Sequence, residues 1–360
     1  MEPTLPANLP KIADEEKIEI TNLQDDYPLE LISQLPGFNQ GISYLRFSDN
    51  NEHLAIGYQT GGVRVYDMER NEYICELEIP KITNYDDYDY NPNEVFFPIT
   101  NIRWYTDSQI LFSSGSGDLK LYNITDPDPK RRLREELNFK DSAINAVDID
   151  LDKNNFITGG SDHYLRVYDC STMKEIICYK GGDTKHSEHF NRIFSVIFDS
   201  SNPHIFYSGG WDKQIMTHDV RQPHAVRSFM GPYIAGDSID ICGNELLAGS
   251  YRSNDPIEVY DVGTGDMIDY IQWDQEDPKK GGMIMTAQYG FPNTETIIAG
   301  SSSSHEVKMW NRKDTSVLST VTGFSGPVVA MHLNDNGDTL AIGSKLGGVV
   351  LLSHGKEKSL

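Results

Sequence analysis

The sequence contains few of the residues that anchor disulfide-linked, metal-bound or membrane-spanning folds. It has four cysteines in 360 residues, and no apolar run approaches the roughly 18 residues that a membrane-spanning helix needs. The cysteines form no Cys-x-x-Cys pair, which favours reduced, buried thiols over a metal site or disulfides. They are Cys75, Cys170, Cys178 and Cys242. The opening residues MEPTLPANLP are neither basic nor hydrophobic, so we expect no signal peptide and no membrane span.

Positive charge is also scarce. Lysine and arginine total 31 against 54 acidic residues, for a formal net charge of −23 and a sequence pI of about 4.7. Nucleic acids and anionic membranes are disfavoured as partners, because binding phosphate requires a basic surface. We expect other proteins with basic surfaces as partners, and a cytoplasmic location.

Catalytic and metal-binding patterns are missing as well. The sequence has no G-x-S-x-G nucleophile elbow and no phosphate-binding loop. His186 and His189 lie three residues apart, but two ligands are too few for a zinc site, and a structural role is the simpler interpretation. We therefore expect a protein that is not an enzyme and that needs no cofactor or metal.

What the sequence does contain is a repeated pattern. The stretch FYSGGWDKQIMTHD (Phe206 to Asp219) places a Gly- and Asp-containing turn between two strand-like runs. Six further copies have the same layout at a spacing of roughly 50 residues, about one seventh of the chain. The copies span 55–67, 111–123, 156–169, 206–219, 246–261, 297–311 and 340–353.

Each copy has a further strand-like run on either side. Runs such as ISYLRF (Ile42 to Phe47) and IFSVIF (Ile193 to Phe198) lie upstream, and short runs such as Lys174 to Tyr179 lie downstream. Four short strands per unit, separated by Gly, Asn, Asp and Pro clusters, predict an all-β fold without long helices.

These units resemble WD40 repeats, and the resemblance covers nearly the whole chain. It implies a seven-bladed β-propeller with four antiparallel strands per blade. We expect an N-terminal tail over residues 1–15, the propeller over 16–353 and a C-terminal tail over 354–360. We further expect the last blade to be closed by an N-terminal strand, and Lys17 to Thr21 (KIEIT), with Ile18 and Ile20 facing the blade, is the predicted strand.

The fourth unit matches the family best. By resemblance, His189, Ser208 and Asp212 correspond to three members of the family's hydrogen-bonded tetrad, and His218 stands where the family has tryptophan. Asp118 and Asp162 hold the turn position of Asp212 in the second and third units. The resemblance assigns these residues to structure rather than to a catalytic triad, since a buried turn must pair its polar groups.

Propellers contact partners mainly through the loops at the two ends of the channel. By resemblance, Trp211, Arg192, Phe194, Tyr251 and Arg252 lie on one such end. Tryptophan and arginine are enriched at binding hot spots, which favours a partner-binding role. Packing of Trp211 against the neighbouring blade is the alternative.

An acidic insertion, NYDDYDYNPNE (Asn84 to Glu94), interrupts the pattern after the first unit. An acidic run is commonly a solvated loop. However, Tyr85, Tyr88 and Tyr90 would give it large contact area at low entropic cost, so a partner-binding loop is the competing interpretation.

The resemblance favours a non-enzymatic scaffold that belongs to a hetero-complex. The segment from Gly231 to Asp261 resembles a sub-family of WD proteins, some of them in cilia and the cytoskeleton, which implies a ciliary or other cytoskeletal assembly. The alternative is a substrate receptor of a cullin-type ubiquitin ligase, because Arg221 follows the closing Asp219 by two residues, as in the motif of such receptors. Fold alone does not decide between them.

Overall fold

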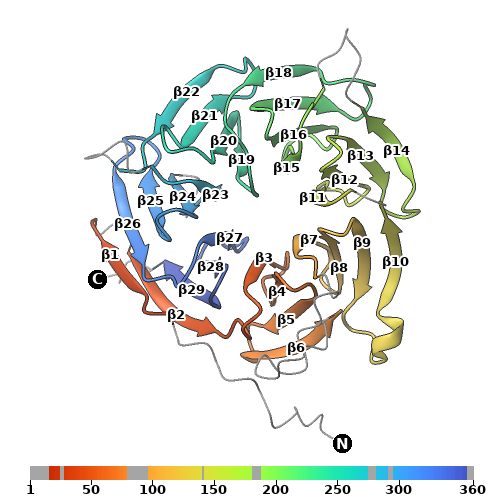
Figure 1. The fold of residues 1–360 in the computed structure, drawn as a ribbon, viewed down its shortest axis with the longest axis horizontal. Coiled ribbons are helices and arrows are strands. Elements are labelled where there is room, and N and C mark those ends of the chain that lie inside the picture. Colours follow the sequence, from red (N-terminus) through yellow and green to blue (C-terminus); the bar gives the residue numbers. More distant parts are fainter. Residues whose placement is uncertain are drawn as a thin grey trace, which may run out of the picture.

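The structure is a computed structural model that describes residues 16–24, 28–78, 96–139, 142–180, 188–274, 281–290 and 295–354. Seven β-sheets stand around a central axis as the blades of a propeller (Figure 1). All pairings within the blades are antiparallel, as the repeats predict. We number the blades 1 to 7 in the chain order of their inner strands.

Each blade runs from an inner strand at the axis to an outer strand at the rim. The inner strands are β3 (Ile42–Phe47), β7 (Ile99–Thr106), β11 (Ile144–Ile149), β15 (Ile193–Phe198), β19 (Ile239–Cys242), β23 (Ile284–Tyr289) and β27 (Val328–Leu333). The second strands are β4 (His53–Tyr58), β8 (Gln109–Ser114), β12 (Asn155–Gly160), β16 (Ile205–Gly210), β20 (Glu245–Gly249), β24 (Thr296–Ser301) and β28 (Thr339–Ser344).

The third and fourth strands complete the blades. The third strands are β5 (Val63–Asp67), β9 (Asp118–Asn123), β13 (Leu165–Asp169), β17 (Gln214–Asp219), β21 (Ile257–Asp261), β25 (Val307–Asn311) and β29 (Val349–His354). The outer strands are β6 (Glu72–Leu77), β10 (Leu133–Asn138), β14 (Glu175–Tyr179), β18 (Arg227–Met230), β22 (Met267–Ile271), β26 (Val317–Thr322) and, in blade 7, β2 (Leu29–Leu35). A single turn of 3₁₀ helix, η1 (Pro129–Arg131), is the only helix among the described residues, none of which form a helix able to cross a membrane.

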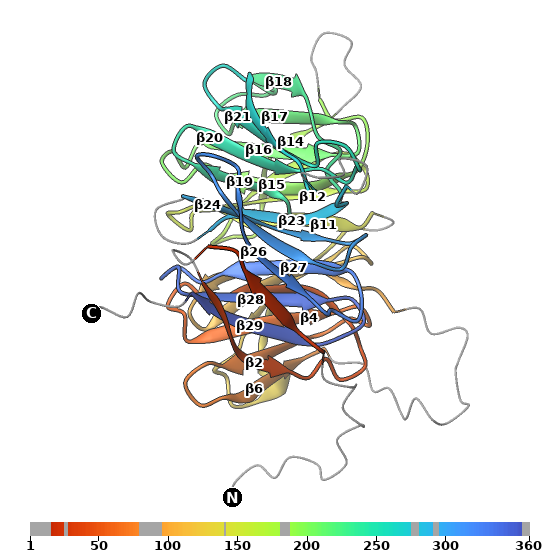
Figure 2. The same ribbon diagram turned by 90° about the vertical axis from the view of Figure 1, so that its left-hand side faces the viewer.

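The N-terminal segment closes the ring, as predicted, but the strand that does so is a different one. β2 pairs with β29 from Leu29↔His354 to Leu35↔Val349 and supplies the missing outer strand of blade 7. The predicted segment instead forms β1 (Glu19–Asn22), which pairs with β26 as a fifth strand of blade 6 (Figure 2). β2 is better placed for blade 7 because it ends only a few residues before β3 begins, so a short connection reaches blade 1.

The hydrophobic core lies between the blades. One cluster joins Ile157 and Val167 of blade 3 to Ile193 and Phe198 of blade 4, for example. Close approach at each interface depends on a glycine in the second strand, where a Cβ atom would collide with the first residue of the next inner strand: Gly57 with Ile99, Gly159 with Ile193, Gly209 with Ile239, Gly249 with Ile284, Gly300 with Val328 and Gly343 with Ile42. Blade 2 has Ser113 at the equivalent position.

Candidate functional site

Two rings of side chains line the central channel, because each inner strand presents its second and fifth residues to the axis. The second-residue ring, at the end where these strands begin, consists of Ser43, Thr100, Asn145, Phe194, Asp237, Met285 and Val329. The fifth-residue ring, at the end where they finish, consists of Arg46, Arg103, Asp148, Ile197, Asp240, Gln288 and His332. We call these ends the proximal and distal mouths. In blade 5 the ladder begins before the assigned strand β19, because the Gly249 N–H donates to the carbonyl of Ser238. With Ser238 counted as part of the inner strand, Asp237 and Asp240 hold the positions equivalent to the second and fifth residues.

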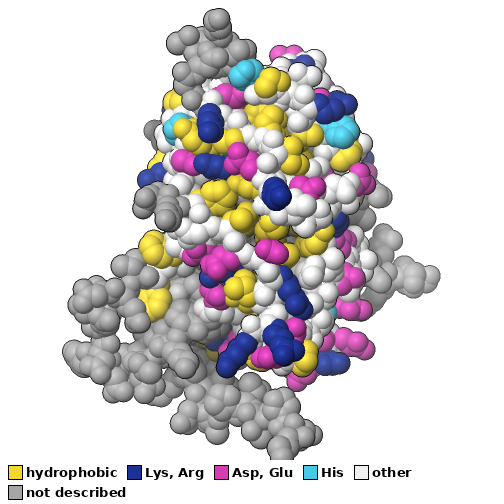
Figure 3. Space-filling view, turned by 90° about the vertical axis from the view of Figure 1, so that its right-hand side faces the viewer, with side chains coloured by type: hydrophobic (Ala, Val, Ile, Leu, Met, Phe, Trp, Pro, Cys, Tyr) yellow, Lys and Arg dark blue, Asp and Glu magenta, His cyan; other side chains and the backbone are white. Residues whose placement is uncertain are grey.

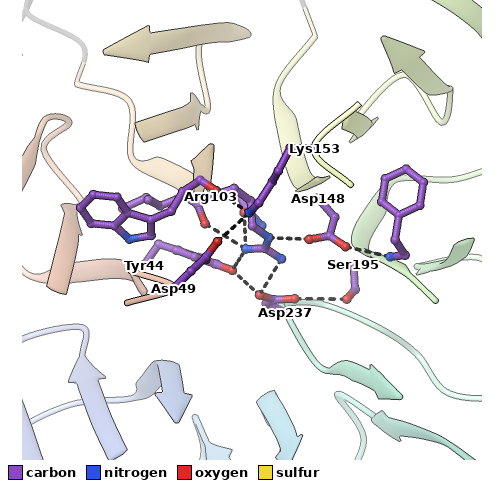
Figure 4. A network of polar contacts seen from close by, with 11 residues as sticks. Tyr44, Asp49, Arg103, Asp148, Lys153, Ser195 and Asp237 are labelled. Atoms are coloured by element: carbon purple, nitrogen blue, oxygen red, sulfur yellow. Dashed lines mark hydrogen bonds and ion pairs between the residues drawn. The ribbon is translucent and has the colours of Figure 1, made fainter. Parts of the chain in front are cut away.

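A polar network separates the two mouths (Figure 4). Arg103 donates from Nε to Asp148 Oδ1 at 2.8 Å and lies 3.6 Å from Asp237. It also donates to the Tyr44 hydroxyl, which in turn donates to Asp237. Burial raises the pKa of Tyr44 to about 12, so the phenol keeps its proton and can donate. Ser195 contacts Asp237 from blade 4 at 3.4 Å. The network ties blades 1 to 5 together across the channel.

The proximal mouth contains a cavity of about 190 Å³ lined by the whole second-residue ring. The side chain of Asp237 is 28% exposed at this level and is the ionisable member of the ring. Lys345 also lines the cavity, but it is exposed, so its ammonium group reaches solvent. The Oδ2 atom of Asp237 contacts Tyr44 and Arg103, whereas its Oδ1 has a single contact among the described residues, with Ser195 at 3.4 Å, and can receive a cationic group.

An aromatic stack extends this mouth over blades 4 and 5. The ring of Trp211 stacks on Phe194 with centroids 5.1 Å apart and on Tyr233 at 5.8 Å. The guanidinium of Arg192 lies 5.2 Å from the Trp211 ring, a cation–π geometry. Because Phe194 belongs to both the stack and the second-residue ring, the aromatic surface is continuous with the cavity.

Trp211 is half-buried, and both the packing and the surface interpretations describe part of its environment. Its two ring neighbours fix its plane, and its Nε1 is buried without a partner in the part of the chain that the structure describes. The edge that remains open borders exposed Arg192. The stack is thus a preformed surface rather than a loose side chain.

The other predicted contact residues are distributed unevenly. Tyr251 is half-buried beside the stack, where its backbone N–H donates to Tyr233 O at 2.8 Å. Arg252 forms an ion pair with Glu258 and donates a hydrogen bond to the carbonyl of Asn254. Its guanidinium group therefore stabilises its own loop. Arg221, 59% exposed, forms a two-pronged pair with Asp219 at 2.8 and 2.6 Å. Tyr85, Tyr88 and Tyr90 lie outside the described residues.

The polar cluster expected in the fourth unit assembles around His189. Its Nδ1 lies 2.6 Å from Asp212 Oδ2 and its Nε2 lies 2.8 Å from Ser208 Oγ. All three residues are buried, with exposures of 1%, 4% and 0% for His189, Asp212 and Ser208. Nδ1–H donation to the carboxylate leaves Nε2 to accept from the hydroxyl, which pairs every buried group.

His218 does not join this cluster, which corrects the expectation drawn from the resemblance. Its Nε2 lies 3.3 Å from Glu188 Oε2, and its ring stacks on Phe206 at a centroid distance of 4.7 Å. The imidazole therefore keeps the aromatic packing expected of tryptophan but turns its polar edge to another partner. Burial lowers the pKa of His218, so the ring stays neutral.

The equivalent turn aspartates use other partners. Asp118 accepts from Ser116 Oγ at 2.6 Å and from the Asn138 amide. Asp162 accepts from the backbone N–H of Tyr164 at 3.2 Å and from Arg166 at 2.6 Å. The turn is thus stabilised by hydrogen bonds to its aspartate in the second and third units as well, although these units lack the histidine.

Sequence reasoning missed Asp237, Tyr233 and Arg103. The fifth unit departs most from the repeat, which hid Asp237 and Tyr233. Counting five residues from the start of β7 would have placed Arg103 in the channel, whereas Asp237 lies before β19 begins and would not have been found in this way. No group of three or more His, Cys, Asp or Glu residues suited to a metal occurs among the described residues, in which all four cysteines are free thiols.

The repeats, the seven blades and the buried His–Ser–Asp cluster define a WD40-repeat β-propeller. The family model "WD domain, G-beta repeat" matches residues 132–169. WD40 propellers are generally interaction scaffolds that bind other proteins.

Curated relatives are similar to part of the chain and do not resolve the subfamily. The chain is 26% identical to mouse (Mus musculus) pre-mRNA-processing factor 19 over 184 residues, which cover 50% of this chain and 33% of that protein. It is 20% identical to Drosophila melanogaster actin-interacting protein 1, over 53% of this chain and 28% of that protein. It is 22% identical to the methylosome protein WDR77 of Xenopus laevis, over 42% and 40%. The matches therefore span well under half the length of each relative.

Proposed function

We propose that the protein is a non-enzymatic scaffold subunit that binds a basic segment of a partner protein at its proximal mouth. The observation that carries this proposal is the Phe194–Trp211–Tyr233 stack, which leads directly into the cavity at Asp237. A rigid aromatic surface gives contact area at little entropic cost, and the carboxylate receives a lysine or arginine.

The overall charge supports a basic protein partner. A net charge of −23 steers cations toward the surface and disfavours nucleic acid and anionic membranes. On the side of the ring that carries β10 and β14, acidic and basic side chains are mixed (Figure 3), as in the ion pairs of Lys120 with Glu78 and Arg134 with Asp126. We therefore assign the attraction for a basic partner segment to the proximal mouth rather than to this side of the ring.

A catalytic role is disfavoured by the burial of the Ser–His–Asp constellation. Ser208 is 0% exposed, so its hydroxyl meets no substrate. The cluster instead satisfies a turn, which is a structural task.

For the cellular setting, we propose a cytoplasmic assembly of the cytoskeleton, the cilium included. The similarity to actin-interacting protein 1 supports a cytoskeletal setting. The ligase-receptor alternative depends on Arg221, and the pairing of Arg221 with its own Asp219 lowers its availability for a partner.

Affinity purification with mass spectrometry tests the proposal, using tagged wild type, Trp211→Ala and Arg221→Ala. Trp211→Ala removes the centre of the aromatic stack, and the melting temperature of each variant checks that the propeller is intact. We expect Trp211→Ala to lose a stable set of cytoskeletal proteins and Arg221→Ala to retain it. Ligase adaptor subunits that disappear with Arg221→Ala would support the receptor function instead, and capture unaffected by Trp211→Ala would exclude the proximal mouth.

A further inference from the structure

The distal mouth holds a larger cavity, of about 350 Å³, lined by the whole fifth-residue ring. The Arg103 network lies between it and the proximal mouth. Asp237 lines both cavities, but Arg46, Gln288 and His332 line the distal one alone.

Acceptor atoms of the fifth-residue side chains form hydrogen bonds between neighbouring blades. In four interfaces, such an atom accepts the backbone N–H of the sixth residue of the next inner strand. The bonds are Phe198 N to Asp148 at 2.7 Å, Tyr289 N to Asp240 at 2.7 Å, Leu333 N to Gln288 at 3.4 Å and Phe47 N to His332 at 3.3 Å. These bonds fix how each side chain is oriented.

With the side chains oriented in this way, donor groups on three consecutive blades remain without a hydrogen-bond partner among the described residues. Gln288 uses Oε1, so its Nε2 is left, buried and without a partner in the described part of the chain. His332 accepts at Nδ1, and burial together with Arg46 and Arg103 holds its pKa well below the usual range, so the neutral ring carries its proton on Nε2. The guanidinium of Arg46 makes no hydrogen bond or ion pair to a described residue.

Four carboxylates line the cavity, and each already accepts hydrogen bonds from other groups. Asp237 accepts from Tyr44, and Asp199 accepts from Ser201 and Tyr207. Asp148 is neutralised by Arg103 at 2.8 Å. Asp240 accepts two backbone N–H groups, from Ile241 and Tyr289, and burial raises its pKa to about 6. It lies on blade 5, beside Gln288 and at the other end of the three-blade arc from Arg46, whose positive charge opposes the rise in the Asp240 pKa. The Arg46 end of the arc is the favourable position for an anion.

We propose that the distal mouth binds a carboxylate group on the arc formed by Arg46, His332 and Gln288. A planar carboxylate has lone pairs for several donors and pairs well with a guanidinium. The volume is near the lower limit, about 300 Å³, of small-molecule sites, which suits a small organic carboxylate or one acidic side chain of a partner.

Isothermal titration of the full chain with citrate, and separately with the capped tripeptide Ac-Glu-Glu-Glu-NH₂, tests this site. Arg46→Gln should weaken binding by about tenfold or more, because it removes a charge-assisted hydrogen bond. Arg70→Gln is the matched control: it removes the same charge from a side chain that is 69% exposed at the rim. It should leave binding unchanged.

Gln288→Glu provides a second variant that keeps an acceptor for Leu333 N while replacing the free donor with a carboxylate oxygen. It should abolish binding, and circular dichroism at the titration temperature checks that the variant is folded. Citrate binding lost in both variants supports a small-anion site, and the same pattern with the tripeptide alone supports an acidic partner segment. No binding of either ligand, or equal weakening by Arg46→Gln and Arg70→Gln, would overturn the proposal.

Discussion

At the residue scale, the buried polar groups of blade 4 make the sharpest prediction about stability. His189→Ala removes the ring that pairs both Asp212 and Ser208. We expect the free energy of unfolding to fall by about 2–4 kcal/mol, since a buried carboxylate loses a partner. Urea denaturation with an unchanged m-value measures the loss. Ser208→Ala, which removes a single neutral bond, should cost only about 1 kcal/mol, and an equal cost for the two variants would contradict this.

Asp240 makes a prediction about pH. Burial raises its folded-state pKa from 3.8 to about 6. Between these values the folded protein binds more protons than the unfolded chain, so the contribution of Asp240 to stability is full below pH 4 and is lost as the pH rises through 6. The stability of wild type relative to Asp240→Asn should therefore fall by roughly 2–3 kcal/mol from pH 4 to pH 7. Chemical denaturation of both proteins across this range measures the difference, and a difference that rises with pH would contradict the assignment.

At the element scale, the second-strand glycines set how closely the blades approach. A Cβ atom on Gly300 would lie 2.5 Å from Val328 Cγ1 and 3.0 Å from Thr286 Cγ2. Gly300→Ala should therefore destabilise the protein by about 1–3 kcal/mol through overpacking. Calorimetry measures the melting temperature. Ser113→Ala is the matched control, because blade 2 already holds a Cβ there and loses only the Thr100 contact. A melting temperature unchanged by Gly300→Ala would show that the interface can expand.

The same elements show what the sequence could predict. The seven copies and their four strands were readable because each blade is a local unit with period-2 alternation and turn residues at fixed places. The partner of His218 was not readable, since Glu188 lies 30 positions away and no pattern links the two. The Arg103 network was equally hidden, because its members come from five different units of the chain.

At the scale of the whole molecule, ring closure depends on chain ends that are far apart in sequence. Edge pairing between residues such as Leu29 and His354 leaves no local signal of which N-terminal strand joins which blade. The structure assigns them different tasks. β2 completes blade 7 and buries Leu29 and Leu35, whereas β1 adds four residues to the already complete blade 6.

Truncation separates these two tasks. Deletion of residues 1–24 removes β1, the packing of Ile18 and Ile20 and the contacts of Glu16 with Ser325 and Ser344. It should lower the melting temperature of a ring that still folds. Deletion of residues 1–35 also removes β2, which exposes the edge of β29 and should abolish cooperative unfolding and promote aggregation.

Calorimetry with size-exclusion chromatography compares both truncations with deletion of residues 1–15, the predicted tail. A chain lacking residues 1–35 that remained monomeric and melted like the full-length protein would show that blade 7 holds without β2. Equal damage from the two longer deletions would instead make β1 the strand that closes the ring. Because β2 closes the ring, its loss should also open both channel mouths. Citrate binding at the distal mouth should therefore disappear together with the cooperative transition.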